Sequence, residues 1–320
     1  MFHITNRKIM SQITKHILMI EPVAFRFNEE TAVNNYYQKV LDGLTPEMTQ
    51  AKALQEFNQF VDKLGACGVN VIVVKDDLET DTPDSIFPNN WVSFHKNGNI
   101  GIYPMCAVNR RKERREDILD VLVDDHGFHI DEIIDFSSFE DADIFLEGTG
   151  SMILDRENKI CYAAISIRTD EQAVFQFCEQ FDYKAVCFVA NQTVENKRLP
   201  IYHTNVMMCV ADNFVIICLD SIDDPAEREL VLGSLKRTNK EIIEIDESQK
   251  HRFAGNMLQL MGDEPVLVMS DSAYNALNKD QISAIEKHCK ILHSSLETIE
   301  ACGGGSARCM MAEIFLPKQN

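Results

Sequence analysis

Short apolar runs recur in pairs along the chain, and each pair is followed by a segment of helical periodicity or by the chain end. Their length and composition predict strands, and turn residues separate the members of a pair, as in Lys96-Asn97-Gly98-Asn99. The predicted strands cover residues 85–95 with 100–103, 144–154 with 160–166, 201–210 with 214–220, 253–261 with 265–270, and 307–316.

Amphipathic segments between these pairs predict helices over residues 114–125, 170–180, 225–236 and 280–289. A further helix over residues 45–64 precedes a strand at 69–74, and the two complete a fifth unit if the chain ends meet. No linker divides the chain. We therefore expect one catalytic domain over residues 17–320 behind an N-terminal extension over residues 1–16, with the start at Met1 or Met10 left open.

One polar residue stands at the same point of each unit. Asn90, Glu147, His203, Asn256 and Cys309 are separated by 57, 56, 53 and 53 residues. A βα unit repeated five times around an axis would bring these positions together at the centre. An ordinary doubly wound sheet is the alternative. The repeat is favoured because the order of strand, turn and helix recurs together with the spacing.

Composition narrows the classes of function. The 320 residues carry a formal net charge of −19 and are 45% hydrophobic. The charge argues against a general nucleic-acid binder and against docking on anionic membranes. No apolar run is long enough to span a bilayer. The ten cysteines contain no CxxC or metal-type spacing and lie mostly in apolar runs, which indicates free thiols and a cytoplasmic protein.

Cys309 is the candidate nucleophile. It follows Gly303-Gly304-Gly305 and Ser306-Ala307-Arg308, a stretch whose backbone can turn sharply and approach a ligand closely. Amide groups of such a loop can also stabilise an oxyanion. The alternative is that Cys309 is a buried structural thiol. We expect the other nine cysteines to be thiols of that kind. Cys302, on the far side of the glycines, is the weaker candidate.

His203 and Glu147 are the candidate partners of this thiol. His203 begins an apolar strand, and its repeat position relative to Cys309 favours a catalytic role over that of a core residue. Glu147 lies between Leu146 and Gly148, where a carboxylate is costly to bury without a partner. We expect Glu147 to orient His203 and keep it protonated. Asp143 competes for this role or else caps a loop.

The elements Glu147-Gly148, His203-Thr204-Asn205 and 303–309 resemble, in this order, the guanidine-modifying (pentein) superfamily. The superfamily includes arginine deiminases, dimethylarginine dimethylaminohydrolases and amidinotransferases. Residues 83–91 are similar to the dimethylarginase substrate segment, and 166–169 to the segment whose arginine grips the substrate carboxylate. The resemblance covers about residues 17–317 and is closest to the citrulline-utilisation hydrolase type. It implies a five-bladed α/β propeller with pseudo-five-fold symmetry.

The resemblance implies a covalent nucleophile at Cys309, a general acid/base at His203 and an orienting carboxylate at Glu147. It also implies that Arg168 forms a bidentate ion pair with the carboxylate of an amino-acid substrate. The alternative is a solvated arginine at the start of a helix. Asp84 would hold the α-amine, unless it is an ordinary turn residue. The further substrate-contacting candidates are Asn89, Asn90, Asn205 and Asn256. The mechanism requires no metal and no cofactor.

Two positions depart from the family pattern. Arginine-acting relatives hold the guanidinium between two carboxylates, whereas this chain has Asn90 and Asn205 there. A carboxamide both donates and accepts hydrogen bonds, which suits a neutral ureido group. The alternative is that Glu147 and Asp84 alone suffice to bind a guanidinium.

We therefore expect a cysteine-dependent hydrolase of non-peptide C–N bonds in a small arginine-like or citrulline-like amino acid. The alternatives are an amidinotransferase with an amine acceptor, an arginine deiminase or dimethylarginase, and a non-catalytic pentein binding module. The expected partner is the small-molecule substrate, with no nucleic acid and no membrane. Homo-oligomerisation is left open.

Overall fold

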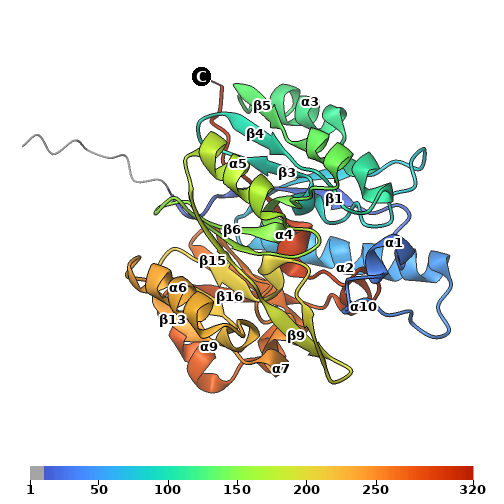
Figure 1. Cartoon of the computed structure of the whole chain (residues 1–320). Coiled ribbons are helices and arrows are strands. Elements are labelled where there is room, and N and C mark those ends of the chain that lie inside the picture. Colours follow the sequence, from blue (N-terminus) through green and yellow to red (C-terminus); the bar gives the residue numbers. More distant parts are fainter. Residues whose placement is uncertain (1–10, 320) are drawn as a thin grey trace, which may run out of the picture.

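The computed structural model describes residues 11–319, in which five three-stranded sheets and one two-stranded ribbon alternate with helices (Figure 1). Most of the expected extension, residues 1–10, lies outside the described residues, as does the question of Met1 or Met10. Within residues 11–319, no helix is both long enough and apolar enough to cross a membrane.

All five sheets share one topology. The first strand pairs antiparallel with the second, and the second pairs parallel with the third after a helical connection. The sheets are β17(Ala312–Ile314)–β1(His16–Glu21)–β2(Asn70–Lys75), β3(Val92–Phe94)–β4(Asn99–Ile102)–β5(Glu132–Asp135), β6(Met152–Asp155)–β7(Ile160–Ala164)–β8(Lys184–Phe188), β11(Met208–Val210)–β12(Phe214–Ile217)–β13(Glu241–Glu244), and β14(Leu258–Met261)–β15(Pro265–Ser270)–β16(Lys290–Ser294).

The expected helices form within these connections. They are α2(Pro46–Ala66), α3(Glu116–Asp124), α5(Glu171–Phe181), α6(Pro225–Lys236) and α9(Lys279–Glu286). Shorter elements are α1(Glu29–Ala32), α4(Gly148–Ser151), α7(Glu247–Lys250), α8(Asp271–Ala276), α10(Glu297–Gly303), and the ribbon β9(Asn191–Val194)–β10(Lys197–Pro200). The 3-10 turns are η1(Pro88–Asn90), η2(Asn109–Glu113), η3(Ser137–Ala142), η4(Thr204–Val206), η5(Leu219–Ser221) and η6(Ala307–Met310).

Each connecting helix buries one face against its sheet. In α5, the side chain of Asp170 caps the first turn by accepting a hydrogen bond from the backbone amide of Gln172. Val174, Phe177 and Phe181 recur at helical spacing and are buried. The same amphipathic pattern made the helices predictable from the sequence.

The chain ends meet in one sheet, as the five-unit prediction required. β17 pairs antiparallel with β1, with Ala312 opposite Leu18 and Ile314 opposite His16. The segment before β1 is also packed, since Gln12 is buried and donates hydrogen bonds to the carbonyls of Leu154 and Val210.

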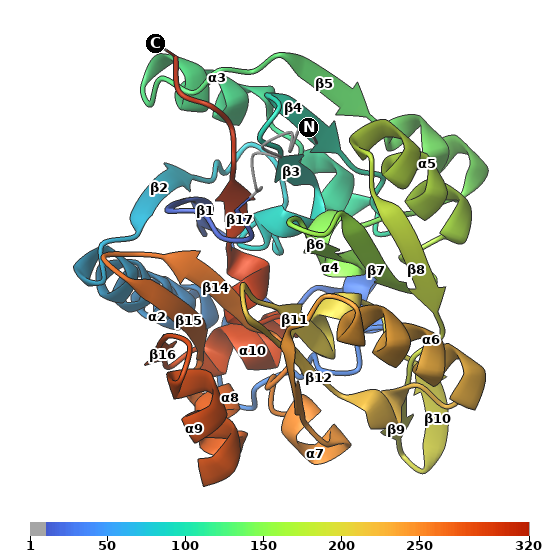
Figure 2. The same cartoon turned by 90° about the vertical axis from the view of Figure 1, so that its left-hand side faces the viewer.

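The sheets follow one another around the middle of the molecule (Figure 2). The short first strands lie innermost in this view, and β17 contacts β3 while β11 contacts both β6 and β14. The helical turns that precede these strands also meet, because α4 contacts η1 and η4, and η1 contacts η6.

The predicted first strands are too long at their N-terminal ends. Residues 85–91, 144–151, 201–207 and 307–311 were expected to be extended, but they contain the helical turns η1, α4, η4 and η6. Because the polar repeat residues lie on or beside such turns, the turns set the direction in which their side chains point. The third strands β5, β8, β13 and β16 were not predicted, since they are short and partly exposed.

Candidate active site

A glycine-rich turn positions Cys309. Helix α10 ends at Gly303 and is capped by Gly304, whose φ of +64° is a left-handed conformation that glycine adopts readily. A Cβ atom at Gly305 would lie 2.9 Å from the ring of Phe87, so only glycine lets the loop pass this ring so closely. The backbone amide of Cys309 then donates 3.0 Å to the carbonyl of Ser306 and starts the η6 turn.

Two amides surround the buried sulfur of Cys309. The Nδ2 atoms of Asn205 and Asn256 each lie 3.3 Å from Sγ. Asn256 is held in this orientation because its Oδ1 atom accepts a hydrogen bond of 3.1 Å from the backbone amide of Arg308. Donors aimed at sulfur stabilise a thiolate more than a thiol. The structure therefore brings these three predicted site residues together.

His203 and Glu147 form the pair that the sequence analysis expected. Nε2 of His203 lies 2.7 Å from Oε2 of Glu147, and both side chains are buried. The other carboxylate oxygen accepts a hydrogen bond of 3.0 Å from the backbone amide of Cys106. Asp143 is not the partner, because it lies at the exposed end of η3 in a left-handed conformation.

The charge state of the pair differs from the expectation. Burial alone would raise the pKa of Glu147, but Arg168, His203 and Arg110 lower it well below its usual range. Burial lowers the pKa of His203 to about 4; Glu147 opposes this shift, while Arg168 and Arg110 add to it. Burial thus favours the neutral form of His203, which can accept a proton, whereas the sequence led us to expect that Glu147 keeps it protonated.

Arg168 is buried and not the solvated arginine of the alternative reading. Its Nη1 atom lies 3.5 Å from Glu147, and its guanidinium lies over the ring of Tyr202 at 5.1 Å. Its remaining donors bind the segment between β1 and α2, namely the carbonyl of Thr31 at 2.9 Å and the side-chain oxygen of Asn34.

Asp84 is also buried, which raises its carboxyl pKa. Its Oδ2 atom accepts hydrogen bonds from the side chains of Asn28 at 2.7 Å and Thr31 at 3.1 Å, while its Oδ1 atom has no partner among the described residues. A buried oxygen without a partner is costly unless a ligand supplies the donor. This buried environment differs from that of a solvent-exposed turn residue.

Arg110 and Glu113 also lie at this site, although their sequence positions did not predict it. Arg110 lies on η2, is buried, and makes a bidentate ion pair with Glu113 at 2.8 and 2.9 Å. It also donates 2.7 Å to Oδ1 of Asn90. Burial raises the pKa of Glu113 to about 7 despite the opposing effect of Arg110. The available signal in the sequence was the i,i+3 spacing of Arg110 and Glu113. However, the charged run 110–117 resembles a solvated surface segment.

Most of these groups face one small cavity. It is lined by Cys309, His203, Arg168, Asn90, Asp84, Arg110, Thr31, Asn35, Phe87, Tyr202 and Gly303–Gly305. Glu147, Asn205 and Asn256 adjoin it through their hydrogen bonds to lining residues. Asn89 does not line it; its buried side chain has no polar partner among the described residues.

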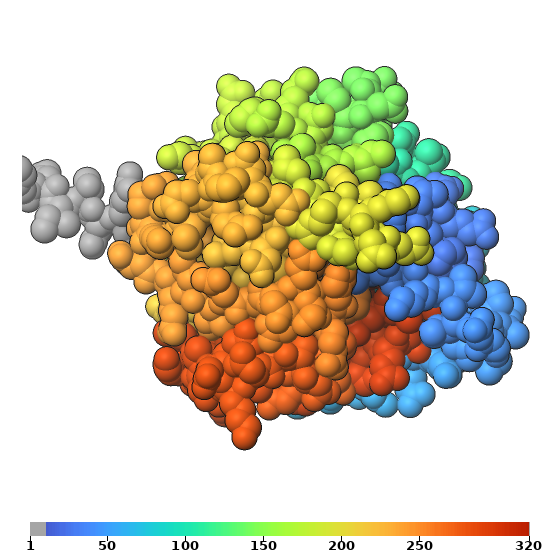
Figure 3. Space-filling model, turned by 60° about the horizontal axis from the view of Figure 1, so that its bottom comes forward, coloured from blue at the N-terminus to red at the C-terminus, as the bar shows by residue number. Residues whose placement is uncertain are grey.

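Residues 22–45, which we call the covering segment, close this cavity. The cavity has a volume of about 10 Å³, which is room for a single water molecule. Thr31 and Asn35 of the covering segment lie in its wall, and on the surface the segment lies between the β9–β10 ribbon and α10 (Figure 3). An amino acid can therefore enter only when the covering segment moves. Within residues 11–319, no group of three or more His, Cys, Asp or Glu residues is arranged to hold a metal.

The chain is similar to known proteins over nearly its whole length. The sequence model of the family "N,N dimethylarginine dimethylhydrolase, eukaryotic" matches residues 21–316. A search of curated proteins finds no match.

Solved structures share the mixed α/β fold. The apo structure of ArgZ, an arginine dihydrolase from the ornithine-ammonia cycle in cyanobacteria, has a TM-score of 0.71 at 16% identity; the match covers 95% of this chain and 41% of that one. The N-terminal domain of ArgZ bound to product has a TM-score of 0.68 at 17% identity, with 94% and 99% covered. A dimethylarginine dimethylaminohydrolase adduct with S-methyl-L-thiocitrulline has a TM-score of 0.61 at 15% identity, with 94% and 100% covered. The chain thus spans less than half the length of full-length ArgZ.

Proposed function

We propose that this chain, which belongs to the N,N-dimethylarginine dimethylhydrolase family of the guanidine-modifying (pentein) superfamily, hydrolyses a non-peptide C–N bond in a small arginine-like or citrulline-like amino acid. The observation that carries the proposal is that Cys309, His203 and Arg168 line one buried cavity, with Glu147 bound to His203. These are the residue types that a covalent hydrolase of this kind needs.

Cys309 is the nucleophile in this proposal. His203, neutral at rest, accepts the thiol proton as sulfur attacks the central carbon of a ureido group. The C–N bond to the terminal nitrogen then breaks, and the imidazolium donates its proton to the departing ammonia. A thiocarbamate on Cys309 remains. His203 then takes a proton from water, which attacks this adduct. The C–S bond breaks, the imidazolium returns its proton to the sulfur of Cys309, and the released carbamate loses carbon dioxide.

Glu147 orients His203 and offsets the charge of the transient imidazolium. The hydrogen bond at 2.7 Å fixes Nε2 as the nitrogen that faces Glu147, which leaves Nδ1 for the reacting groups. Asn205 and Asn256 stabilise the thiolate through their amide donors. Arg168 binds the substrate carboxylate once the covering segment releases it. Asp84 binds the α-amine through its unpartnered oxygen.

We further propose a neutral ureide as the preferred substrate. Arg110 occupies the oxygen of Asn90, so the Nδ2 atom of Asn90 is a buried donor without a partner among the described residues. Asn205 has the opposite arrangement, because its Nδ2 atom contacts Cys309 and its Oδ1 atom is unpartnered. One free donor and one free acceptor match the carbonyl and N–H groups of a ureide. A guanidinium offers donors only.

Guanidino hydrolysis is the second candidate. Asp84 and Glu147 place two carboxylates at the cavity, and an arginine dihydrolase is among the structural neighbours. Against this candidate stands Arg110, whose cation adjoins the cavity and disfavours a second cation in the same small space.

The architecture fits a single catalytic domain. We propose that the five sheets are the blades of a five-bladed α/β propeller and that residues 17–320 form this domain; the common sheet topology and the meeting of the chain ends support both statements. We also propose a cytoplasmic location, because all ten cysteines are free thiols in the structure.

The function is tested by incubating the full chain with citrulline, arginine, methylated arginines and agmatine, followed by amino-acid analysis. We expect citrulline to be consumed fastest and agmatine, which lacks the carboxylate for Arg168, to be a poor substrate. Faster turnover of arginine would refute the ureide preference while leaving the hydrolase intact. An acceptor amine that replaces water in the product would instead indicate an amidinotransferase.

A further inference from the structure

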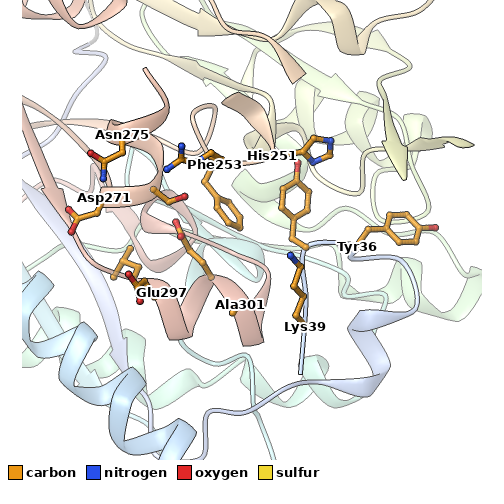
Figure 4. Close-up of a pocket in the computed structure, with 13 residues that line it drawn as sticks. Tyr36, Lys39, His251, Phe253, Asp271, Asn275, Glu297 and Ala301 are labelled. Carbon is orange, nitrogen blue, oxygen red and sulfur yellow. The ribbon is translucent and has the colours of Figure 1, made fainter. Parts of the chain in front are cut away.

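A second cavity, of about 550 Å³, lies on the outer side of the covering segment (Figure 4). Tyr36, Tyr37 and Lys39 of that segment form one wall, and α8 and α10 form the opposite wall. The active-site cavity holds about 10 Å³ in the closed structure, whereas the second cavity is large enough for an amino acid.

Charges of opposite sign face each other across the second cavity. Figure 4 shows Asp271 and Glu297 on one side, and Lys39 with the ring of Tyr36 on the other. The aromatic side chains can contact a cation through their faces. A small molecule with separated positive and negative groups would therefore be complemented at both ends.

Tyr37 connects the wall of the second cavity with the active site. Tyr37 lines the second cavity, and the Tyr37 hydroxyl has no hydrogen-bond partner among the described residues. The ring of Tyr37 packs against Phe253 at 5.1 Å and against Tyr202 at 6.1 Å. Tyr202 in turn lines the active-site cavity and donates 2.6 Å to the carbonyl of Gly304. Two aromatic side chains in contact, Tyr37 and Tyr202, thus lie between the two cavities.

A chain of hydrogen bonds also links this cavity, through Glu300 and Ser306, to Cys309. Glu300, on α10, lines the cavity and accepts a hydrogen bond of 2.6 Å from the hydroxyl of Ser306. The carbonyl of Ser306 accepts the backbone hydrogen bond that starts the turn of Cys309. Lys39 also binds α10 directly, because its amide donates 2.6 Å to the carbonyl of Ala301.

We propose that the second cavity is an effector site for a basic amino acid, a zwitterion with a cationic side chain, and that its occupation favours the closed covering segment. The ligand carboxylate binds Lys39, and its cationic groups bind Asp271 and Glu297. Because Lys39 moves with the covering segment while α8 and α10 belong to the body, a ligand that bridges them binds the closed state better than the open one. It therefore lowers the affinity of the active site for substrate, because the closed cavity has no room for an amino acid.

The test uses L-lysine, which has two ammonium groups and a carboxylate but no ureido or guanidino group to hydrolyse. Calorimetry on the native chain, on Asp271→Asn/Glu297→Gln and on Arg168→Ala measures lysine binding. Asp280→Asn/Glu286→Gln, which changes two exposed acids of α9, is the matched control. We expect binding to the native chain, the control and Arg168→Ala, and at least tenfold weaker binding to Asp271→Asn/Glu297→Gln.

Kinetics give the second readout. Lysine should raise the KM for citrulline at least threefold in the native chain and in the control, and leave it unchanged in Asp271→Asn/Glu297→Gln, whose basal activity is retained. Lysine binding that is lost in Arg168→Ala but kept in Asp271→Asn/Glu297→Gln would overturn the proposal, because lysine would then bind only in the active site. The binding measurement holds even if citrulline is not hydrolysed, so failure of the proposed function is seen separately.

Discussion

Arg110 donates a hydrogen bond of 2.7 Å to Oδ1 of Asn90 and so determines which end of this amide is free at the active-site cavity. Arg110 can only donate, which forces the oxygen of Asn90 toward it and leaves Nδ2 as the free atom. A carboxylate at position 90 would satisfy Arg110 equally well but would present an acceptor to the ligand.

Asn90→Asp should therefore shift the substrate preference from ureide to guanidinium. The variant loses the donor for the ureido oxygen and gains a negative charge beside the reacting group. We expect kcat/KM for citrulline to fall by about 10²-fold, as when one donor to a developing charge is lost. The value for arginine should fall less or rise. Steady-state kinetics on both substrates measure the ratio.

Asn89→Asp is the matched control for this change, since Asn89 is the adjacent buried amide but does not line the cavity. Its citrulline-to-arginine ratio should equal that of the native chain, whatever the loss of stability. An unchanged ratio in Asn90→Asp would remove the argument for a neutral substrate.

The buried ion pair of Arg110 and Glu113 should be structural as well as functional. Arg110→Met leaves the carboxylate of Glu113 buried without its bidentate partner, which typically costs about 3–5 kcal/mol of unfolding free energy. Since burial raises the pKa of Glu113 to about 7 even with Arg110 present, acidification should protonate it and return part of the loss. Urea unfolding at neutral and mildly acidic pH measures this difference.

The double variant Arg110→Met/Glu113→Met separates the two roles. Removing both charges should bring the unfolding free energy back to within about 1–2 kcal/mol of the native value. Citrulline turnover should stay low, because Asn90 has lost the group that orients it. Recovery of activity together with stability would show that Arg110 acts only on the fold.

Protonation of His203 should make kcat/KM for citrulline fall only at low pH. With its pKa lowered to about 4 by burial and by Arg168 and Arg110, His203 is neutral and competent as a base down to that value. The acid limb of kcat/KM for citrulline should then lie near that pKa and well below about 6.5, the ordinary value for histidine. A pH profile with a neutral substrate measures it.

The same shift has a consequence for stability. The unfolded chain binds a proton at His203 below about pH 6.5, where the folded chain does not, so this residue lowers the unfolding free energy as the pH falls toward 4. His203→Asn should flatten that part of the stability profile. An acid limb of kcat/KM near about 6.5 would mean that burial does not lower the pKa of His203.

The fold was largely predictable, because helices such as α5 bury apolar residues at regular spacing and the five units repeat. The third strands were not, since β5 buries no residue fully and carries no alternating pattern. The inner strands were overextended because apolar stretches such as 201–207 look alike in a strand and in a buried helical turn.

The site was predictable where repeat position and residue type agreed, as for His203 and Glu147. Arg110 was missed because its burial depends on Glu113, Asn90 and the covering segment, none of which marks it in the sequence. The lowered pKa of His203 was also not predictable, since it depends first on burial and then on Arg168 and Arg110. Both depend on contacts between distant segments.

Cys309 and Cys302 should respond oppositely to substitution. Cys309→Ala should abolish turnover and the covalent mass adduct while leaving citrulline binding measurable. Cys302 lies on α10 with its thiol buried in a hydrophobic cluster, so Cys302→Ala should keep the adduct and cost about 1 kcal/mol of stability. Mass spectrometry after rapid quenching distinguishes them. An adduct that persists in Cys309→Ala would assign the nucleophile elsewhere.

Gly150 should be a position where an added methyl group affects activity more than folding. A Cβ atom there would lie 2.3 Å from Nδ2 of Asn90 and 2.9 Å from the imidazole of His203, and both of these side chains can shift. Gly150→Ala should therefore lower kcat/KM for citrulline by about 10²-fold, as misplacement near the reacting atoms does, at a cost of about 1–3 kcal/mol in stability.

Gly148→Ala is the contrast, because its Cβ atom would lie 2.3 Å from the backbone oxygen of Asn89 and its φ is +46°. That variant should lose mainly stability. Kinetics and urea unfolding on both variants compare the effects, and full activity in Gly150→Ala would mean that Asn90 and His203 need not keep their present positions.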